Sequence, residues 1–327
     1  MLVLGIESTA HTFGVGIVRG ENIFANVWDM YTTEPGKGII PIESANHHEK
    51  VKNQVLEKAL KKADVKIEDI DVISFSHGAG LPPCLKVGKD FAVELAEKHK
   101  KPLVPVCHQV AHIDIGKLLT GSCNPVVLFT SGANTQVLAF EDGYYRCFGE
   151  TMDVGIGNAL DKFGRAAGLG FPAGPKIEEL ARKSKNYIEL PYVVKGMDLS
   201  FSGIITSTIN KLKKEKIEDL CYSLQETLFS MLTEVTERAL AHTEREELLL
   251  TGGVAANKRL NEMLTKMCKE RGANVYNVPK EYAGDNGAMI AYSGLLSYSA
   301  GITVDPKKAD FNPRLRTDQW EVKWEQI

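Results

Sequence analysis

Two histidines, His108 and His112, are the residues whose spacing most clearly suggests chemistry. On a helix, residues four apart lie on one face, so both imidazoles can bind one metal ion, as in the zinc-protease motif H-E-x-x-H. Here Gln109 follows the first histidine, where a zinc protease carries its general-base glutamate. The spacing predicts a metal site and argues against peptide hydrolysis. Two unrelated histidines on a helix surface are the alternative interpretation.

A third ligand must come from elsewhere, because two side chains make a poor metal site. Asp285, within Ala283-Gly284-Asp285-Asn286-Gly287, is the best candidate. An Asp just ahead of a helix is also a preferred N-cap. The two roles are compatible, since one carboxylate oxygen is enough for the metal.

Three short turns could hold a phosphate or a nucleoside. Glycine lets a backbone approach a ligand closely, and successive backbone N–H groups can form an anion-binding nest. A helix that begins after such a turn adds free N–H groups and the positive end of its dipole. Each turn alone could be an ordinary connection. The turns contain Glu7, Ser8 and Thr9, then Thr130, Ser131, Gly132 and Ala133, and finally Gly252 and Gly253.

Three polar residues could complete a nucleotide site. Asp161 could accept hydrogen bonds from ribose hydroxyls, or could belong to a salt-bridged surface with Lys162 and Arg165. Glu178 follows Gly174-Pro175 at a predicted helix start, where acidic residues are favoured by the dipole, and could also bind a ribose. Asn257 could contact the nucleotide or cap the helix that follows.

The composition is that of a globular protein: 327 residues, 43% apolar and 25% charged, with a net charge of −3. This charge argues against nucleic-acid binding by bulk charge, and the local basic runs are typical of solvated helix faces. The start carries no basic region of a signal peptide, and no apolar run is long enough to cross a bilayer. Six scattered cysteines favour reduced thiols, so we expect a cytoplasmic location and no membrane partner.

The elements that must position these residues follow from periodicity. We expect strands at 2–7, 14–18, 22–29, 72–76, 103–106, 125–130, 135–140, 247–250 and 274–278. We expect helices at 47–62, 84–100, 158–167, 176–183, 218–244 and 287–299, one helix carrying the two histidines, and a loop at 31–43.

The strand–polar turn–strand unit at the start recurs after residue 124, which indicates an internal duplication. This layout of paired hairpins and a Gly-Gly turn is similar to that of the actin-, Hsp70- and hexokinase-like ATPases. We therefore predict an α/β, two-lobed fold of that kind with duplicated mixed-sheet lobes. The predicted divisions are an N-terminal lobe at 1–117 with the metal-binding helix, a nucleotide-binding lobe at 118–300, and a tail at 301–327 that packs back on the body.

Beyond these local patterns, the whole chain resembles the tRNA N6-threonylcarbamoyladenosine transferases, specifically the archaeal and eukaryotic catalytic subunit of the KEOPS complex. The resemblance is carried by segments along the full length: 5–9, 80–88, 108–116, 131–136, 148–153, 158–161, 174–178, 197–203, 251–257, 285–291 and 311–324.

The resemblance implies transfer of a threonylcarbamoyl group from threonylcarbamoyl-adenylate to N6 of adenosine 37, in tRNAs that read codons starting with A. It also implies one divalent metal ion, iron or zinc, at His108, His112 and Asp285. The adenylate, or ATP in the same site, would be bound by 129–133 together with Asp161, Gly174, Glu178 and Asn257.

Three departures from the family pattern are visible. Phe129 stands where archaeal relatives often carry a tyrosine that can reach the metal, so one oxygen ligand is lost. Ala133 replaces the second glycine of the usual Ser-Gly-Gly turn, and Gly80-Leu81-Pro82-Pro83 differs from the usual Gly-Leu-Gly-Pro. We expect a three-ligand metal site with open positions.

Family relatives imply four partners: tRNA, a small dimerising subunit, a small protein kinase that is fused C-terminally in some archaea, and an accessory tRNA-binding subunit. Two alternatives stay open from the residues alone. One is a metalloprotease, the glycoprotease of an older family name, against which Gln109 counts. The other is an ATPase-type scaffold subunit, for which histidine metal ligands are unexpected because Mg-nucleotide prefers oxygen.

Overall fold

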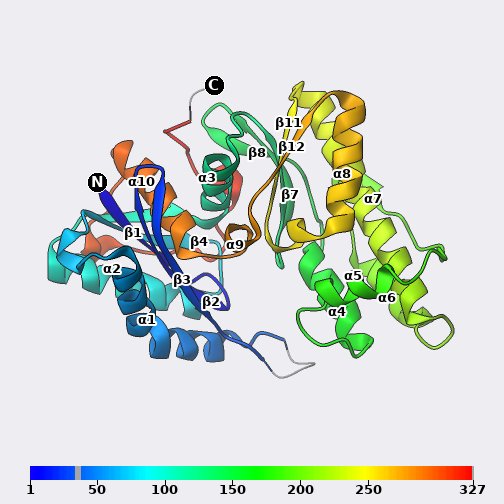
Figure 1. The fold of residues 1–327 in the computed structure, drawn as a ribbon, viewed down its shortest axis with the longest axis horizontal. Helices are drawn as coiled ribbons and strands as arrows, with labels where there is room; N and C mark the ends of the chain where they lie inside the picture. The colour runs from blue at the N-terminus through cyan, green and yellow to red at the C-terminus, as the bar shows by residue number, and fades with distance from the viewer. Residues whose placement is uncertain (34–37, 326–327) are drawn as a thin grey trace.

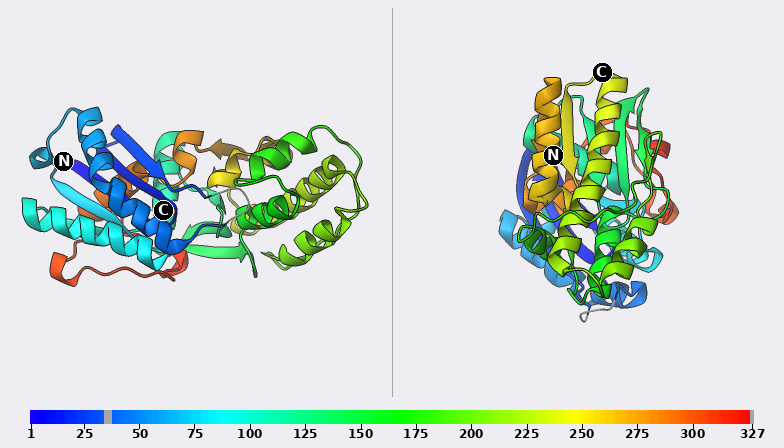
Figure 2. Two further views of the ribbon diagram at one scale, coloured as in Figure 1. Left: turned by 90° about the horizontal axis from the view of Figure 1, so that it is seen from below. Right: turned by 90° about the vertical axis from the view of Figure 1, so that its right-hand side faces the viewer.

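The computed structural model describes residues 1–33 and 38–325, which form two lobes side by side, each built on a five-stranded mixed sheet (Figures 1 and 2). The first sheet has the order β3-β2-β1-β4-β5, with strands Asn22–Met30, Thr12–Arg19, Leu2–Glu7, Val72–Gly78 and Leu103–Cys107. The second has the order β12-β11-β6-β7-β8, with strands Asn274–Asn277, Glu247–Thr251, Val126–Thr130, Thr135–Glu141 and Tyr144–Glu150.

The two sheets share one topology, which confirms the predicted duplication. In each sheet a three-stranded antiparallel meander supplies one half, β1-β2-β3 or β6-β7-β8. Two further strands then add in parallel to the first strand of the meander, β4 and β5 or β11 and β12. The predicted two-lobed fold with duplicated mixed sheets is confirmed.

The first sheet is covered on both faces, which explains why β1 is buried at every position and its residues from Leu2 to Ile6 are apolar instead of alternating with polar ones. Leu2, Leu4 and Ile6 pack with α1 (Pro41–Ala63) and α2 (Pro82–His99), while Val3 packs on the opposite face with α10 (Gly287–Ser299). A Cβ at Gly5 would lie 2.1 Å from the backbone nitrogen of Ala291, so this glycine sets how closely α10 approaches the sheet.

The second lobe follows the same plan with more helices. Val126, Leu128 and Leu250 face a core shared with the helices at the far side of the lobe (Figure 1). Those helices are α4 (Ile156–Ala166), α5 (Gly174–Ala181), α6 (Ser202–Lys211), α7 (Ile217–Thr243) and α8 (Lys258–Arg271). A short two-stranded sheet, Val194–Lys195 with Asp198–Leu199, lies beside them.

Helix α3 (His108–Thr120) lies between the two lobes. Ala111 and Ile115 pack in the core that contains α10 and the first sheet, whereas Val110 and Ile113 pack against Phe129 and Leu249 of the second sheet. The histidine helix therefore contacts both sheets.

The C-terminal tail also contacts both lobes. Val304 forms a bridge with Leu103 at the edge of the first sheet, and Glu321 forms one with Tyr144 at the edge of the second. Two segments depart from the predicted division of the chain: α10, assigned to the second lobe, packs on the first sheet, and α3 is shared between the lobes. After β12 the chain returns to the first lobe, where α10 packs on the first sheet. No local sequence pattern predicts this packing, because it joins residues far apart in the chain.

Several element boundaries differ from the sequence prediction. Helix α1 begins at Pro41 rather than His47, because proline is suited to the first helical turn; part of the predicted loop at 31–43, residues 34–37, lies outside the described residues. Strand β8 and helix α6 were not predicted. Strand β8 alternates poorly between apolar and polar residues, and α6 is rich in β-branched residues, which favour strands.

No helix in the described part of the chain is long and apolar enough to cross a membrane.

Candidate metal centre and nucleotide turns

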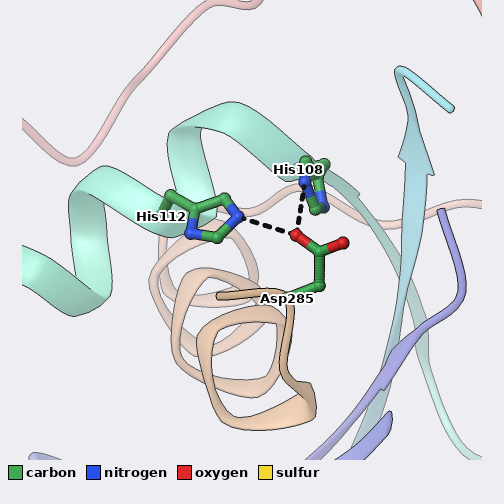
Figure 3. A group of neighbouring side chains, drawn as sticks. All are labelled: His108, His112 and Asp285. Carbon is green, nitrogen blue, oxygen red and sulfur yellow. Dashed lines mark hydrogen bonds and ion pairs between the residues drawn. The ribbon is translucent and has the colours of Figure 1, made fainter. Parts of the chain in front are cut away.

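The two histidines occupy the first and second turns of α3, directly after β5 ends at Cys107 (Figure 3). A strand that runs straight into a helix fixes the direction of the first helical turn. Helical periodicity then places His112 one turn further along the same face. Both side chains are largely buried, with His108 8% and His112 1% exposed.

Asp285 completes the group, as predicted. Its Oδ1 lies 3.4 Å from Nε2 of His108 and 3.3 Å from Nε2 of His112, so both ring nitrogens face one carboxylate oxygen (Figure 3). One candidate ligand atom from each residue lies within 4.8 Å of the others. Two imidazole nitrogens and one carboxylate oxygen form a donor set suited to iron or zinc.

Asp285 is not the N-cap of α10, which the sequence left as an alternative role. That role falls to Asn286, whose side chain accepts a hydrogen bond from the backbone N–H of Met289 at 3.0 Å. The Asp285 carboxylate is therefore directed to the histidines and not to the helix end.

Glu7 supports His108 from the opposite side. Its Oε2 lies 3.0 Å from Nδ1 of His108, while Glu7 also accepts hydrogen bonds from the hydroxyls of Ser76 at 2.6 Å and Thr9 at 2.5 Å. A ring nitrogen bonded to a carboxylate leaves the other nitrogen oriented for a metal, the usual arrangement around a ligating histidine. Sequence reasoning placed Glu7 in a phosphate turn and missed this contact, although a carboxylate at the end of a buried strand needs a partner.

The negative charges of Glu7 and Asp285 favour a positive charge at the histidines. Burial alone would lower the pKa of His108, but the nearby carboxylates of Glu7 and Asp285 raise it to about 10. Burial opposes ionisation of Asp285 too, yet the two histidines hold its pKa well below the ordinary value. The fully buried Glu7 and the half-buried Asp285 thus require positive charge beside them, which a proton on His108 or a divalent ion can supply.

His112 has the protonation state that a metal ligand needs. Burial lowers its pKa, which favours the neutral imidazole. Its ring lies 5.2 Å from that of Phe129, which is 1% exposed and offers no oxygen. The residues present therefore fit a three-ligand metal site, and the identity of the metal is not fixed by them.

The first predicted turn is joined to this group. The backbone N–H of Thr9 donates to Glu7 at 2.7 Å, and the Thr9 hydroxyl lies 3.4 Å from Nδ1 of His108. Ser8 is buried and its hydroxyl has no hydrogen-bond partner among the described residues.

The second and third turns lie against one another in the second lobe. The Thr130 hydroxyl donates to the carbonyl of Thr251 at 3.3 Å, and Gly252 has a φ of 95°. A Cβ at Gly252 would lie 2.4 Å from the carbonyl oxygen of Thr130, so only glycine fits where the two turns touch. Gly132 and Ala133 are exposed at the tip of the second turn, which Ser131 closes through hydrogen bonds with Asn134.

The four other predicted nucleotide residues lie on helices of the second lobe or directly before one, and hydrogen bonds to their chain neighbours bring them together in two pairs. Asp161 on α4 accepts from the backbone N–H of Ala173, directly before Gly174. Glu178 on α5 accepts from the N–H of Lys258, directly after Asn257, and also pairs with Arg182. Asn257 caps α8, its side chain accepting from Arg259 and Leu260. Among the described residues, no hydrogen bond or ion pair joins these four to the histidine–aspartate group.

The chain is similar to known proteins in both sequence and fold. Residues 22–292 match the family model described as tRNA N6-adenosine threonylcarbamoyltransferase. The tRNA N6-adenosine threonylcarbamoyltransferase of Thermococcus sibiricus is 54% identical over 326 residues, covering 99% of this chain and all of the relative.

A second relative is longer. A probable bifunctional tRNA threonylcarbamoyladenosine biosynthesis protein of Methanosarcina acetivorans is 51% identical over 98% of this chain, which spans 59% of that protein. Among solved structures, HypF from T. kodakarensis shares 16% identity with a TM-score of 0.65, over 92% of this chain and 48% of that one. This last likeness concerns the fold alone.

Proposed function

Because the chain belongs to the tRNA N6-adenosine threonylcarbamoyltransferase family, we propose that its His108, His112 and Asp285 form the metal centre of that reaction. The enzyme forms N6-threonylcarbamoyladenosine in tRNA. We further propose threonylcarbamoyl-adenylate as the donor and adenosine 37 of tRNAs that read codons starting with A as the acceptor.

The observation that carries the proposal is the close grouping of two buried imidazoles and a half-buried carboxylate beside a turn predicted to bind phosphate. The donor is a mixed carbamic–phosphoric anhydride, so no protein nucleophile is needed. N6 of adenine forms a bond to the carbamoyl carbon, the bond from that carbon to the phosphate oxygen breaks, and AMP leaves as N6 loses a proton. A divalent iron or zinc ion bound at the centre would supply a Lewis acid and a template for the donor oxygens.

The protein's own residues would position the donor. Backbone N–H groups of the turns at 7–9, 130–133 and 252–253 would hold the phosphate. Asp161 and Glu178 would accept hydrogen bonds from ribose hydroxyls, with Gly174 and Asn257 beside them. Glu7 would keep His108 oriented through the contact at 3.0 Å.

Two residues tune the proposed site. Phe129 lies against His112 but offers no oxygen, so water or substrate would fill the position that a tyrosine could occupy. Ala133 adds a methyl group at the exposed tip of the second turn, which reduces the room beside the phosphate.

We also propose that the enzyme works with other subunits in the cytoplasm. The bifunctional name and greater length of the M. acetivorans relative support a second activity that acts with this one. The family resemblance suggests the KEOPS partners: a small dimerising subunit, a protein kinase and an accessory tRNA-binding subunit. Six free cysteines agree with a reducing compartment.

Incorporation of radiolabelled threonine into tRNA tests the proposal. Wild-type protein, supplied with enzymatically made threonylcarbamoyl-adenylate and the partner subunits, should label a tRNA with adenosine at position 37 and not the same tRNA with guanosine there. The His108→Ala/His112→Ala variant should lose most of this labelling. Full transfer by that variant after metal removal would overturn the metal role.

The same assay separates the transferase from both alternatives. A scaffold subunit would leave the tRNA unlabelled and would be needed only for activity of its partners. A metalloprotease would cleave a protein substrate and would also leave the tRNA unlabelled.

A further inference from the structure

A lysine-lined groove of about 790 Å³ lies on the second lobe, outside the metal centre. One wall is helix α8, and the other is the segment from Asn277 to Lys280 that leads from β12 into α9 (Lys280–Ala283). Ala255 and Val278, both buried, form its floor.

The charge of this groove is opposite to that of the chain. Lys258, Lys266, Lys269 and Lys280 line it and are exposed. Its one acidic lining residue, Glu262, is already paired with Arg259 at 3.2 Å. Among the described residues, Lys266 has a single long ion pair with Glu270 at 4.0 Å, and the other three lysines have none. Three ammonium groups thus remain available to an anion in a chain of net charge −3.

The lysines are arranged as a track. Lys258, Lys266 and Lys269 lie on one face of α8, and a rise of 1.5 Å per residue separates the first and last by roughly 16 Å. Lys280 faces them from across the groove. A single phosphate could not contact groups so far apart, whereas a polynucleotide backbone could.

The groove leads toward the proposed catalytic centre. Ala255 and Ala256, which line one end, belong to the short helix Gly253–Ala256 that follows the Gly252 turn. Lys280 begins α9, and the chain then continues through Gly284 to Asp285. Figure 1 shows α9 at the centre of the molecule and α8 along the second lobe. A strand in the groove would therefore lie beside the segment that carries a metal ligand.

We propose that this groove binds the phosphate backbone of the tRNA substrate and guides the modified loop toward the metal centre. The proposal rests on the proposed function, since it names the surface by which that site receives its RNA. Electrostatic contacts to phosphates supply most sequence-independent affinity for nucleic acid. A local cationic track allows such contacts in a protein whose total charge is negative.

The test is the salt dependence of tRNA binding by a Lys258→Gln/Lys269→Gln/Lys280→Gln variant of the full chain. Each lost phosphate contact lowers the slope of log affinity against log salt by about 0.7 to 0.9, so the slope should fall by about 2. Affinity at about 0.1 M salt should fall on the order of 10- to 100-fold. A Lys185→Gln/Lys213→Gln/Lys214→Gln variant removes the same charge from exposed lysines elsewhere and should keep the wild-type slope.

Unchanged affinity and slope in the groove variant, or an equal loss in the control variant, would overturn the proposal. So would a loss of binding to ATP or inorganic phosphate with tRNA binding intact, because the groove would then hold a small anion. Ultraviolet cross-linking of wild-type protein to tRNA gives a second readout, and cross-links should map to peptides within 258–280. If wild-type protein labels tRNA while the groove variant binds it normally, only this inference fails and the proposed function stands.

Discussion

At the scale of single residues, the most informative feature is the set of hydrogen bonds by which residues other than the metal ligands hold His108 in place. Glu7 is fully buried and holds Nδ1 of His108, while Ser76 and Thr9 hold Glu7. The ligand pattern His-x-x-x-His with Asp285 was predictable from residue type and spacing. The supporting carboxylate was not, because the contact joins residues 101 positions apart.

The first prediction concerns Glu7→Gln. The amide keeps the size of the side chain but removes the negative charge beside His108. Metal affinity should fall about 10- to 100-fold, as is typical when a residue that orients a ligand is changed. Competition with a chromophoric chelator measures this, with Glu57→Gln, an exposed change on α1, as the matched control. Equal metal affinity in both variants would contradict the role assigned to Glu7.

The second prediction concerns acid stability and His48, a buried histidine that bonds the carbonyl of Ala10 at 3.1 Å. Burial lowers its pKa from 6.5 to about 4. The unfolded chain therefore binds a proton more readily than the folded one, and the stability due to neutral His48 is lost as pH falls from about 6.5 to 4. The loss is bounded by about 3 kcal/mol.

Urea unfolding of wild type and His48→Leu at pH 7 and pH 4.5 isolates this effect. The leucine variant should lose less free energy of unfolding between the two pH values. An identical loss in both proteins would show that His48 does not titrate as inferred.

At the scale of elements, the duplicated strand pattern could be predicted from the sequence, but the packing of late helices on the first lobe could not. The hairpins, the parallel strands and most helices follow from apolar periodicity, and both sheets were predictable as copies of one unit. The packing of α10 on the first sheet was not, because it depends on the approach of Ala291 to Gly5 across the whole chain. The same holds for α3, whose two apolar faces give no indication of which lobe each contacts.

The third prediction tests the contact between the second and third turns. Gly252→Ala places a methyl group 2.4 Å from the Thr130 carbonyl oxygen at a φ of 95°. We expect a loss of stability of about 1–3 kcal/mol and a weakened donor site, because the two turns must separate. Gly203→Ala on α6 is the control, since Gly203 is exposed and no atom lies within 4 Å of its Cβ position. Thermal unfolding and donor binding should change in the first variant only.

At the scale of the whole molecule, the tail joins the histidine helix to the second lobe. The indole N–H of Trp324 donates to buried Asp114 on α3 at 3.2 Å. Glu325 accepts from Lys117 on α3 at 2.6 Å and from the hydroxyl of Tyr145 on β8 at 3.1 Å. We call these contacts of Trp324 and Glu325 the C-terminal clasp. Sequence patterns could not predict the clasp, because its partners are single polar residues far apart in the chain.

The fourth prediction follows from this clasp. Trp324→Phe keeps most of the ring contact but removes the donor to Asp114. The free energy of unfolding should fall by about 1–3 kcal/mol, the usual cost of an unsatisfied buried polar group. Trp28→Phe is the control, because Trp28 is 43% exposed and has no hydrogen bond from its ring among the described residues. Equal stability of the two variants would contradict a structural role for the clasp.

The most direct test of the central claim measures metal content and transfer rate on the same preparations of wild type, His112→Ala and His99→Ala. His99 also lies at a helix position, the end of α2, but outside the metal centre. Wild type and His99→Ala should each hold about one divalent ion per chain and transfer threonylcarbamoyl to tRNA at equal rates. The His112→Ala variant should lose both properties together. Wild-type metal content and rate in His112→Ala would contradict the assignment of the metal centre.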